Sequence, residues 1–492
     1  MWSYYKYIHD IKRLFKKFMA NVRLFIYILI SLFFHILFIN LHPVNLEELF
    51  LYASENIASK TDLELYFKYQ ANTLLYSTIL HFLSKIFPFI ELNALSKIIS
   101  CSGYVFLGIG IYYLRKNSYI SFSHDMVFLL IAINPLIWSF GYRGTPDFIS
   151  LAIGFCGLCL TLDKNKILEK SGYLILGLSI ALKPHSIIFF IFLFLKKINF
   201  SKNVIEHINT NYLNIILLLL IPTLFFVGNY IKYDFLLLND NLQNNHSLSI
   251  ENVLPNLISY FGILTIFCFL IFFYIFLKDI FRKDYLVFKC GLVYITIFIP
   301  LSLILNFDGE IFLGFLSSII NQRLYIYILV ILSFLSLFYL IKLFKSNKDL
   351  ERLIILSSLI FIFLLALSRP SDRYIIFLIT FIIILFRYEL QSKILTFFYF
   401  IFNITIASII FSNQYINSTL TKNIKKSLVE KKLQYNTDLG NLFVHAPVFK
   451  NEFGKTQDFK FKLYMYKKKV SIHDECVQVL FFNKCYSIVK TK

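Results

Sequence analysis

Two adjacent carboxylates, Glu47 and Glu48, follow the first long apolar stretch of the chain. A carboxylate in such a position could act as a general base and take the proton of an acceptor hydroxyl while the new bond forms. Glycosyl transfer also develops positive charge on the sugar ring, which a nearby carboxylate stabilises. Glu47 and Glu48 are therefore the candidate catalytic residues, and the sequence does not decide between them.

Basic and polar residues that could hold a phosphate recur near the ends of later apolar stretches. Arginine is suited to this task because its guanidinium binds phosphate oxygens in pairs. Charges are costly in a bilayer unless they are paired or hydrated, so their recurrence predicts a shared polar cavity, although each could also be an ordinary charge of an interfacial loop. The candidate substrate-binding residues are Arg143, Asp147, Lys183, His185, Arg369, Arg373 and Tyr374, with Asp372 among the neighbouring charges.

The composition indicates a protein that lies in a lipid bilayer. Of the 492 residues, 58% are hydrophobic and 18% are aromatic, and the mean hydropathy is +0.67. The formal net charge of +20 would suggest nucleic-acid binding in a soluble protein. Here the lysines and arginines stand mostly between apolar spans, as positive charge retained on the cytoplasmic side does, so we expect no nucleic-acid partner.

These features predict an all-α polytopic membrane protein with about 11–13 transmembrane helices and extracytoplasmic juxtamembrane helices. Residues 1–20 form a basic amphipathic lead, which we expect on the cytoplasmic leaflet. Residues 21–411 form the transmembrane domain, and its first outer loop, 42–93, contains Glu47 and Glu48. Residues 412–492 are expected to form a small extracytoplasmic domain of α+β or β-rich type, because alternating runs at 459–466 and 477–482 predict strands. In that location Cys476 and Cys485 could form a disulfide.

The order of the spans follows from keeping the basic loops on the cytoplasmic side. Residues 72–90 are interpreted as a juxtamembrane helix, because a crossing there would put Arg115 and Lys116 outside. Residues 172–197 carry Lys183 in the middle and predict two half-length helices that meet there, as in transporter cavities, with a single kinked span as the alternative. The remaining predicted spans are about 23–41, 94–114, 125–141, 146–162, 209–231, 257–277, 285–305, 323–344, 352–368, 373–388 and 394–411.

Four stretches together carry a resemblance to a known family. They are the acidic segment 46–52, the Asn134-Pro135 helix that leads to Arg143 and Asp147, the segment Gly177–Pro184, and Arg373-Tyr374 at the start of a late span. In this order, over about residues 20–390, the chain resembles the GT-C superfamily of membrane glycosyltransferases, whose known members use polyprenyl-phosphate sugars.

The resemblance implies roles for individual residues. Glu47 matches the first-loop catalytic acid and Glu48 its acidic neighbour, although the family usually has aspartate at the first position. Asp147 matches the second-loop acid, which in some members helps to hold a metal or to orient the acceptor. Lys183 and Arg373 would face the lipid phosphate. A divalent cation, Mg or Mn, stays open, with Glu47 and Asp147 as its ligands, because the sequence contains no dense ligand cluster.

The expected function is therefore transfer of a hexose or pentose, with inversion, from a polyprenyl-phosphate donor to a glycan, lipid or protein acceptor in cell-envelope glycan biosynthesis. We expect an integral protein of a bacterial inner membrane, with the N-terminus cytoplasmic and the C-terminus extracytoplasmic. One alternative is an O-antigen-type polymerase or ligase, which the absence of arginine from the loop 232–256 disfavours. Another is a transporter or flippase of lipid-linked glycans with a midplane site at residues 172–197.

Overall fold

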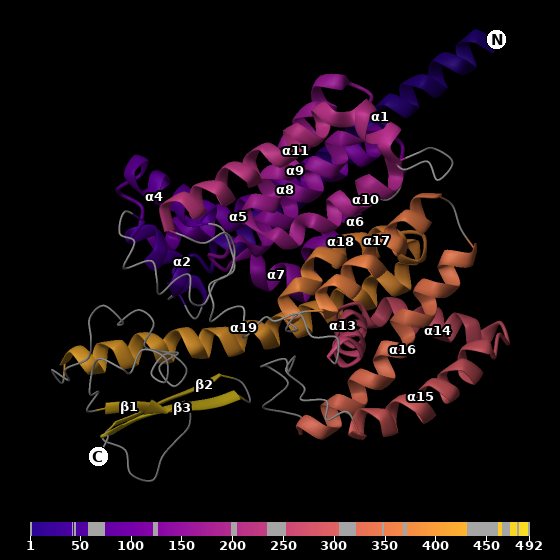
Figure 1. Cartoon of the computed structure of the whole chain (residues 1–492). Helices are drawn as coiled ribbons and strands as arrows, with labels where there is room; N and C mark the ends of the chain where they lie inside the picture. Colours follow the sequence, from indigo (N-terminus) through magenta and orange to yellow (C-terminus); the bar gives the residue numbers. More distant parts are fainter. Residues whose placement is uncertain are drawn as a thin grey trace.

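Apolar helices make up most of the chain, and a three-stranded sheet lies near its C-terminus (Figure 1). The structure is a computed structural model. It describes residues 2–41, 43, 46–57, 74–121, 126–197, 204–233, 252–304, 321–346, 349–367, 371–430, 461–464, 473–479 and 482–490.

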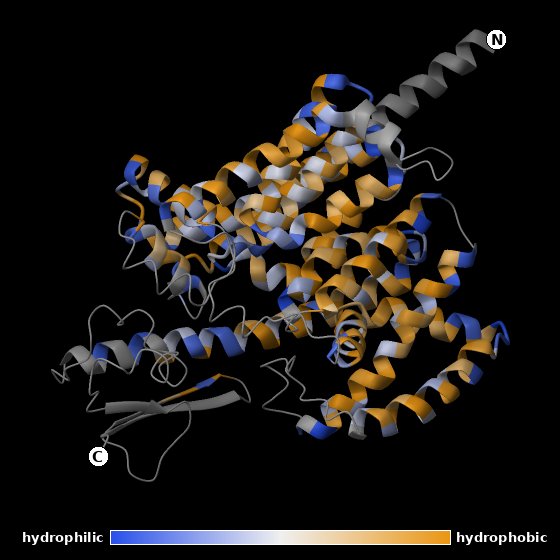
Figure 2. Ribbon diagram, in the orientation of Figure 1, coloured by the Kyte–Doolittle hydropathy of each residue, from blue (hydrophilic) through white to orange (hydrophobic). Residues whose placement is uncertain are grey.

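The described helices are those of a multi-pass membrane protein by length and composition (Figure 2). Five are long and apolar enough to cross a bilayer, or seven if each of two bent pairs is one span. The predicted 11–13 helices refer to the whole chain, whereas this count covers the described residues, in which further apolar helices are shorter than the roughly 20 residues that a crossing requires. Those shorter apolar helices are Pro184–Lys196, Leu286–Ser302 and Arg373–Leu385.

The predicted N-terminal lead and first span form one helix, α1 (Trp2–Ile36), of which Phe18–Ile36 is long and apolar enough to span. Two short helices follow the span: α2 (Leu46–Glu55) and α4 (Leu75–Ile86). With 12 residues, α4 is about 18 Å long, which is too short to cross the hydrocarbon core. The interpretation of this segment as a helix that does not cross is therefore consistent with its length.

The centre of the fold is α8 (Pro146–Thr161), all of whose side chains are buried. It packs between α5 (Leu92–Lys116) and α9 (Lys166–Leu182). The contact with α9 is close because glycines stand at the crossing: a Cβ on Gly157 would lie 2.8 Å from the backbone nitrogen of Leu176. This packing fixes the start of α8 beside the end of α9.

Two predicted spans are broken by one asparagine. The stretch predicted at 125–141 forms α6 (Val127–Ala132) and α7 (Pro135–Gly141), because the Asn134 side chain caps α7 and Pro135 occupies its first turn. The stretch predicted at 257–277 forms α13 (Val253–Phe267) and α14 (Phe269–Phe281), which are bent by 88°. At this bend the Asn134 amide donates to the Phe267 carbonyl over 2.9 Å. A side chain that interrupts the backbone hydrogen bonds of a helix permits such a kink.

The predicted break at Lys183 is confirmed, but its first half is longer than expected, since α9 begins at Lys166 instead of residue 172. Beyond Lys183 come η1 (Pro184–Ser186), α10 (Ile187–Lys197) and α11 (Val204–Tyr233). The later helices are α15 (Leu286–Ile304), α16 (Gln322–Ser346), α17 (Asp349–Ala366), η2 (Asp372–Ile375), α18 (Ile376–Leu385), η3 (Glu389–Gln391) and α19 (Lys393–Glu430).

The C-terminal sheet has the strand order β1-β3-β2, with β1 (Phe461–Tyr464), β2 (His473–Val479) and β3 (Phe482–Lys490) antiparallel to their neighbours. The predicted strand at 477–482 is instead the end of β2 and the first residue of β3. Cys476 is disulfide-bonded and lies opposite Cys485 in the register. The predicted start of the tail at residue 412 falls inside α19, which continues to Glu430 and packs against β2 (Figure 1).

Candidate functional site

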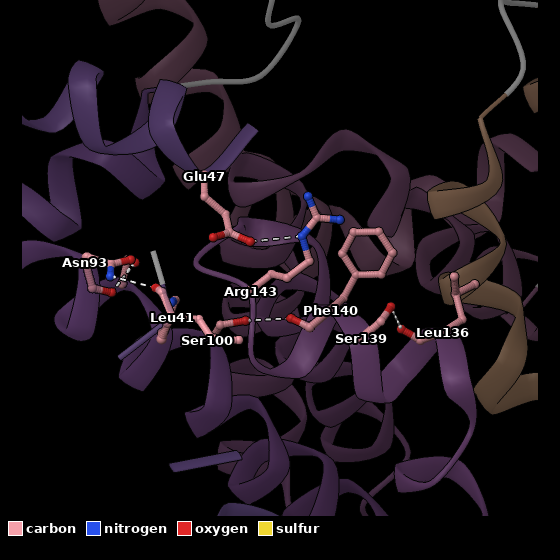
Figure 3. A network of polar contacts seen from close by, with 10 residues as sticks. Leu41, Glu47, Asn93, Ser100, Leu136, Ser139, Phe140 and Arg143 are labelled. Carbon is pink, nitrogen blue, oxygen red and sulfur yellow. Dashed lines mark hydrogen bonds and ion pairs between the residues drawn. The ribbon is translucent and has the colours of Figure 1, made fainter. Parts of the chain in front are cut away.

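Glu47 forms a buried ion pair with Arg143. The Arg143 Nε lies 3.0 Å from Oε1 of Glu47, and the carboxylate side chain is only 6% exposed (Figure 3). Glu47 stands in the first turn of α2 and Arg143 in the loop between α7 and α8, so segments almost 100 residues apart meet here. The guanidinium also lies over the Phe140 ring, 5.2 Å from its centroid.

The short helices α2 and α4 hold Glu47 in place. The Ser77 hydroxyl of α4 donates to the Phe50 carbonyl over 3.2 Å, and the His81 ring lies 2.9 Å from the Ser54 carbonyl. Phe50 packs edge-on against Tyr76. These contacts tie each turn of α2 that follows Glu47 to α4, and they give His81 a structural role.

The loop that carries Arg143 lies directly against α5. A Cβ on Gly144 would stand 2.1 Å from Oγ of Ser96, so only glycine permits this approach. The Ser100 hydroxyl donates to the Phe140 carbonyl over 3.0 Å and fixes the end of α7 on the same helix (Figure 3).

Asp147 and Lys183 form a second ion pair, 2.9 Å long, in which the side chains are 0% and 1% exposed. Asp147 lies in the first turn of α8, where the helix dipole stabilises a negative charge. Lys183 sits at the break after α9, in extended backbone, and Pro184 starts η1. The Ser150 hydroxyl joins the two segments through the Ser179 carbonyl and the Ser186 hydroxyl.

Two residues of η2, Arg373 and Tyr374, lie beside the Asp147–Lys183 pair. The ring of Tyr374 stacks on His185, with centroids 3.8 Å apart and an interplanar angle of 18°. The Arg373 guanidinium donates to the Tyr374 hydroxyl over 3.3 Å and interacts electrostatically with Asp147 and Lys183. The segment is anchored by Tyr260, whose hydroxyl accepts from the Ser371 N–H.

The chain matches no protein-family model, no curated protein and no solved structure. The assignment of function therefore depends on the side chains themselves. Of the predicted site residues, the structure brings Asp147, Lys183, His185, Arg373 and Tyr374 together, and it pairs Glu47 with Arg143. Arg369 and the side chains of Glu48 and Asp372 lie outside the described residues.

Two residues of the site were not predicted from the sequence. The Tyr76 hydroxyl donates to the Ser96 carbonyl over 3.1 Å, and burial, together with the nearby charges of Glu47 and Asp147, raises the pKa of its phenol well above the usual value. Lys97 is buried on α5, donates to the Leu41 carbonyl and interacts electrostatically with Glu47. Lys97 could have been noticed in the sequence, because a lysine near the start of an apolar span is unusual.

Glu47 and Asp147 are the carboxylates that the sequence suggested as ligands of a divalent cation. Glu47 and Asp147 each face a basic side chain, and the described residues contain no group of three or more His, Cys, Asp or Glu side chains that could hold a metal ion.

Proposed function

We propose that this protein is a GT-C-type membrane glycosyltransferase, which moves a sugar from a polyprenyl-phosphate donor to a glycan, lipid or protein acceptor on the extracytoplasmic face of a bacterial inner membrane. The observation that carries the proposal is the pair of buried ion pairs, Glu47–Arg143 and Asp147–Lys183, whose carboxylates both lie near Tyr76. Acid, base and phosphate-binding groups are thereby grouped at one end of the helix bundle.

The proposed reaction assigns a role to each side of this site. Glu47 takes the proton of an acceptor hydroxyl as its oxygen attacks the anomeric carbon of the sugar. The bond from that carbon to the phosphate oxygen breaks on the opposite face, which inverts the configuration and releases polyprenyl phosphate. Lys183 and Arg373 stabilise the negative charge of the departing phosphate. Arg143 positions the Glu47 carboxylate before the acceptor binds.

The burial of these charges favours a functional explanation over a purely structural one. A buried ion pair contributes little net stability, because removing both charges from water costs about as much as their attraction returns. In a membrane protein such residues commonly mark a substrate path. The Asp147–Lys183 pair is the most deeply buried one among the described residues, which fits that pattern.

The charge distribution supports the extracytoplasmic placement of the site. At the other end of α5, Lys116 pairs with Asp163 over 2.9 Å, and Lys166 and Lys196 lie nearby on α9 and α10. The 25 residues of α5 cover about 37 Å, so the two ends belong to opposite sides of a bilayer. Retention of basic residues in the cytoplasm then leaves Glu47 and Asp147 outside.

A transfer assay with a matched pair of variants tests the proposal. Purified protein is incubated with a labelled polyprenyl-phosphate sugar and a panel of hydroxyl-bearing acceptors. We expect sugar transfer by the wild type, loss of at least 100-fold in Glu47→Gln as for removal of a general base, and a smaller effect in Glu48→Gln. Full activity in folded Glu47→Gln would overturn the role of Glu47.

The same assay separates the two alternatives. A transporter or flippase would leave the sugar–phosphate bond intact while moving the labelled lipid across a liposome. An O-antigen-type polymerase or ligase would transfer a complete glycan and not the single sugar. Either result would replace the proposed activity.

A further inference from the structure

A cavity lies between α19 and the start of α6, at the end of the bundle opposite Glu47 and Asp147. Its volume is 770 Å³, within the range of ligand sites. Its polar lining residues are Arg387, Gln391, Lys393 and Thr396, and no carboxylate is among its described lining residues. The cavity therefore favours an anionic ligand.

The apolar wall of the cavity is one face of α19. Phe397, Phe400, Ile401 and Ile404 all line it, at the spacing of a single helical stripe. Phe397 and Ile401 are 62% and 48% exposed, in a helix whose first 28 residues are apolar enough to span a membrane. Lipid is thus the natural neighbour of this wall.

The length of the cavity matches one leaflet. The 11 residue-to-residue steps from Lys393 to Ile404 rise about 17 Å along α19, about half of the roughly 30 Å hydrocarbon thickness. A ligand with a charged group at Lys393 and an aliphatic chain along the stripe would therefore fit a single layer of lipid.

Arg387 provides a buried donor beside this position. The residue is 4% exposed, its Nη2 donates to Glu351 over 3.2 Å, and its Nη1 donates to the Ile384 carbonyl over 2.8 Å. Its buried Nε–H has no acceptor among the described residues. A buried donor without a partner costs free energy, so an acceptor from a ligand would stabilise this arrangement.

We propose that this cavity binds an anionic phospholipid of the cytoplasmic leaflet. Its phosphate contacts Arg387, Gln391 and Lys393, and one acyl chain lies along Phe397, Ile401 and Ile404. Basic pockets at the cytoplasmic ends of membrane helices are suited to such headgroups. This site is separate from the proposed transfer site, and it does not depend on the identity of the sugar or the acceptor.

Native mass spectrometry of the full chain in detergent tests the proposal, with phosphatidylglycerol, phosphatidylcholine and inorganic phosphate as separate ligands. We expect phosphatidylglycerol to bind more tightly than phosphatidylcholine, and inorganic phosphate not to compete with it at equal concentration. Lys393→Ala should weaken phosphatidylglycerol binding about five-fold, as expected for one basic side chain near an anionic lipid. Lys345→Ala, at the exposed end of α16, should leave the affinity unchanged.

A second pair of variants tests the acyl wall. Ile401→Trp fills the cavity and should weaken binding, whereas Phe398→Trp, on an exposed part of α19 outside the lining, should not. Equal binding of the two lipids, competition by inorganic phosphate, or equal effects within either pair of variants would overturn the proposal. Sugar transfer is not measured, so failure here leaves the transferase proposal to be judged by its own assay.

Discussion

The ammonium of Lys183 lies 2.9 Å from the carboxylate of Asp147, and neither side chain is more than 1% exposed. The two residues reach each other because α8 begins where α9 ends, and the glycines between these helices allow close packing. Pro184 ends the helix at Lys183 and turns the chain into η1, which brings His185 against Tyr374. A local break in one helix thus assembles the polar centre.

The Asp147–Lys183 pair gives a prediction that separates stability from function. Lys183→Met removes the ammonium that contacts the buried Asp147 carboxylate and should lower the free energy of unfolding by about 3–5 kcal/mol. The double variant Asp147→Leu/Lys183→Met removes both charges and should recover most of this loss, but without sugar transfer. Thermal unfolding in detergent and the transfer assay measure the two effects.

An exposed pair provides the control for this experiment. Lys166 is 82% exposed and pairs with Glu169 three residues further along α9. Lys166→Met should change neither stability nor transfer measurably, because exposed ion pairs contribute little. Recovery of transfer in the double variant would mean that the buried pair is only structural.

The close approach of Gly144 to α5 predicts a loss that a second substitution reverses. In Gly144→Ala the new methyl would collide with the Ser96 hydroxyl and displace the loop that carries Arg143. Transfer should fall at least ten-fold, since a displacement of about 1 Å in a positioning group can cost more than that. Ser96→Gly removes the obstructing side chain, so the double variant should regain most of the activity. Absence of rescue would contradict a positioning role for this loop.

The stacking of His185 on Tyr374 predicts that the ring is required and its ionisation is not. His185→Phe keeps an aromatic face and should retain transfer within a few-fold. His185→Ala removes the stack, which is worth about 0.5–1.5 kcal/mol beyond its buried area, and should lower both stability and transfer. The transfer activities of the two variants distinguish these roles, because a proton donor at this position would make His185→Phe as inactive as His185→Ala.

Part of the site could be predicted from the order of apolar stretches and charges along the sequence. The retention of basic loops on one side predicts, without any knowledge of packing, that Glu47, Arg143, Asp147 and Arg373 share the opposite side. The rule does not say which acid meets which base, and those pairings depend on how α5, α8 and α9 pack. Lys97 escaped notice because its partners, Glu47 and the Leu41 carbonyl, are distant in sequence.

The bend within a predicted span could not be predicted, for a related reason. Hydropathy measures how apolar a stretch is, but a kink can come from one distant polar side chain. The amide of Asn134 reaches the Phe267 carbonyl from a segment 133 residues away, and the predicted span at 257–277 bends by 88° there. No pattern within residues 257–277 contains that information, since neither proline nor glycine stands at the break.

The Lys116–Asp163 pair at the other end of the bundle predicts a pH dependence of stability. Burial raises the pKa of Asp163, but hydrogen bonds from the Asn165 N–H, Lys116 and Asn117 outweigh this effect and hold the pKa below its usual value. A carboxylate with a lowered folded-state pKa contributes stability above its unfolded pKa, and that contribution is lost as the pH falls through the folded-state pKa. Asp163→Asn should therefore lower the unfolding temperature at neutral pH and have little effect in strong acid. Unfolding temperatures of the two proteins, recorded between about pH 2 and pH 7, should converge toward the acid end, and a constant difference would show that Asp163 acts through packing and not through its charge.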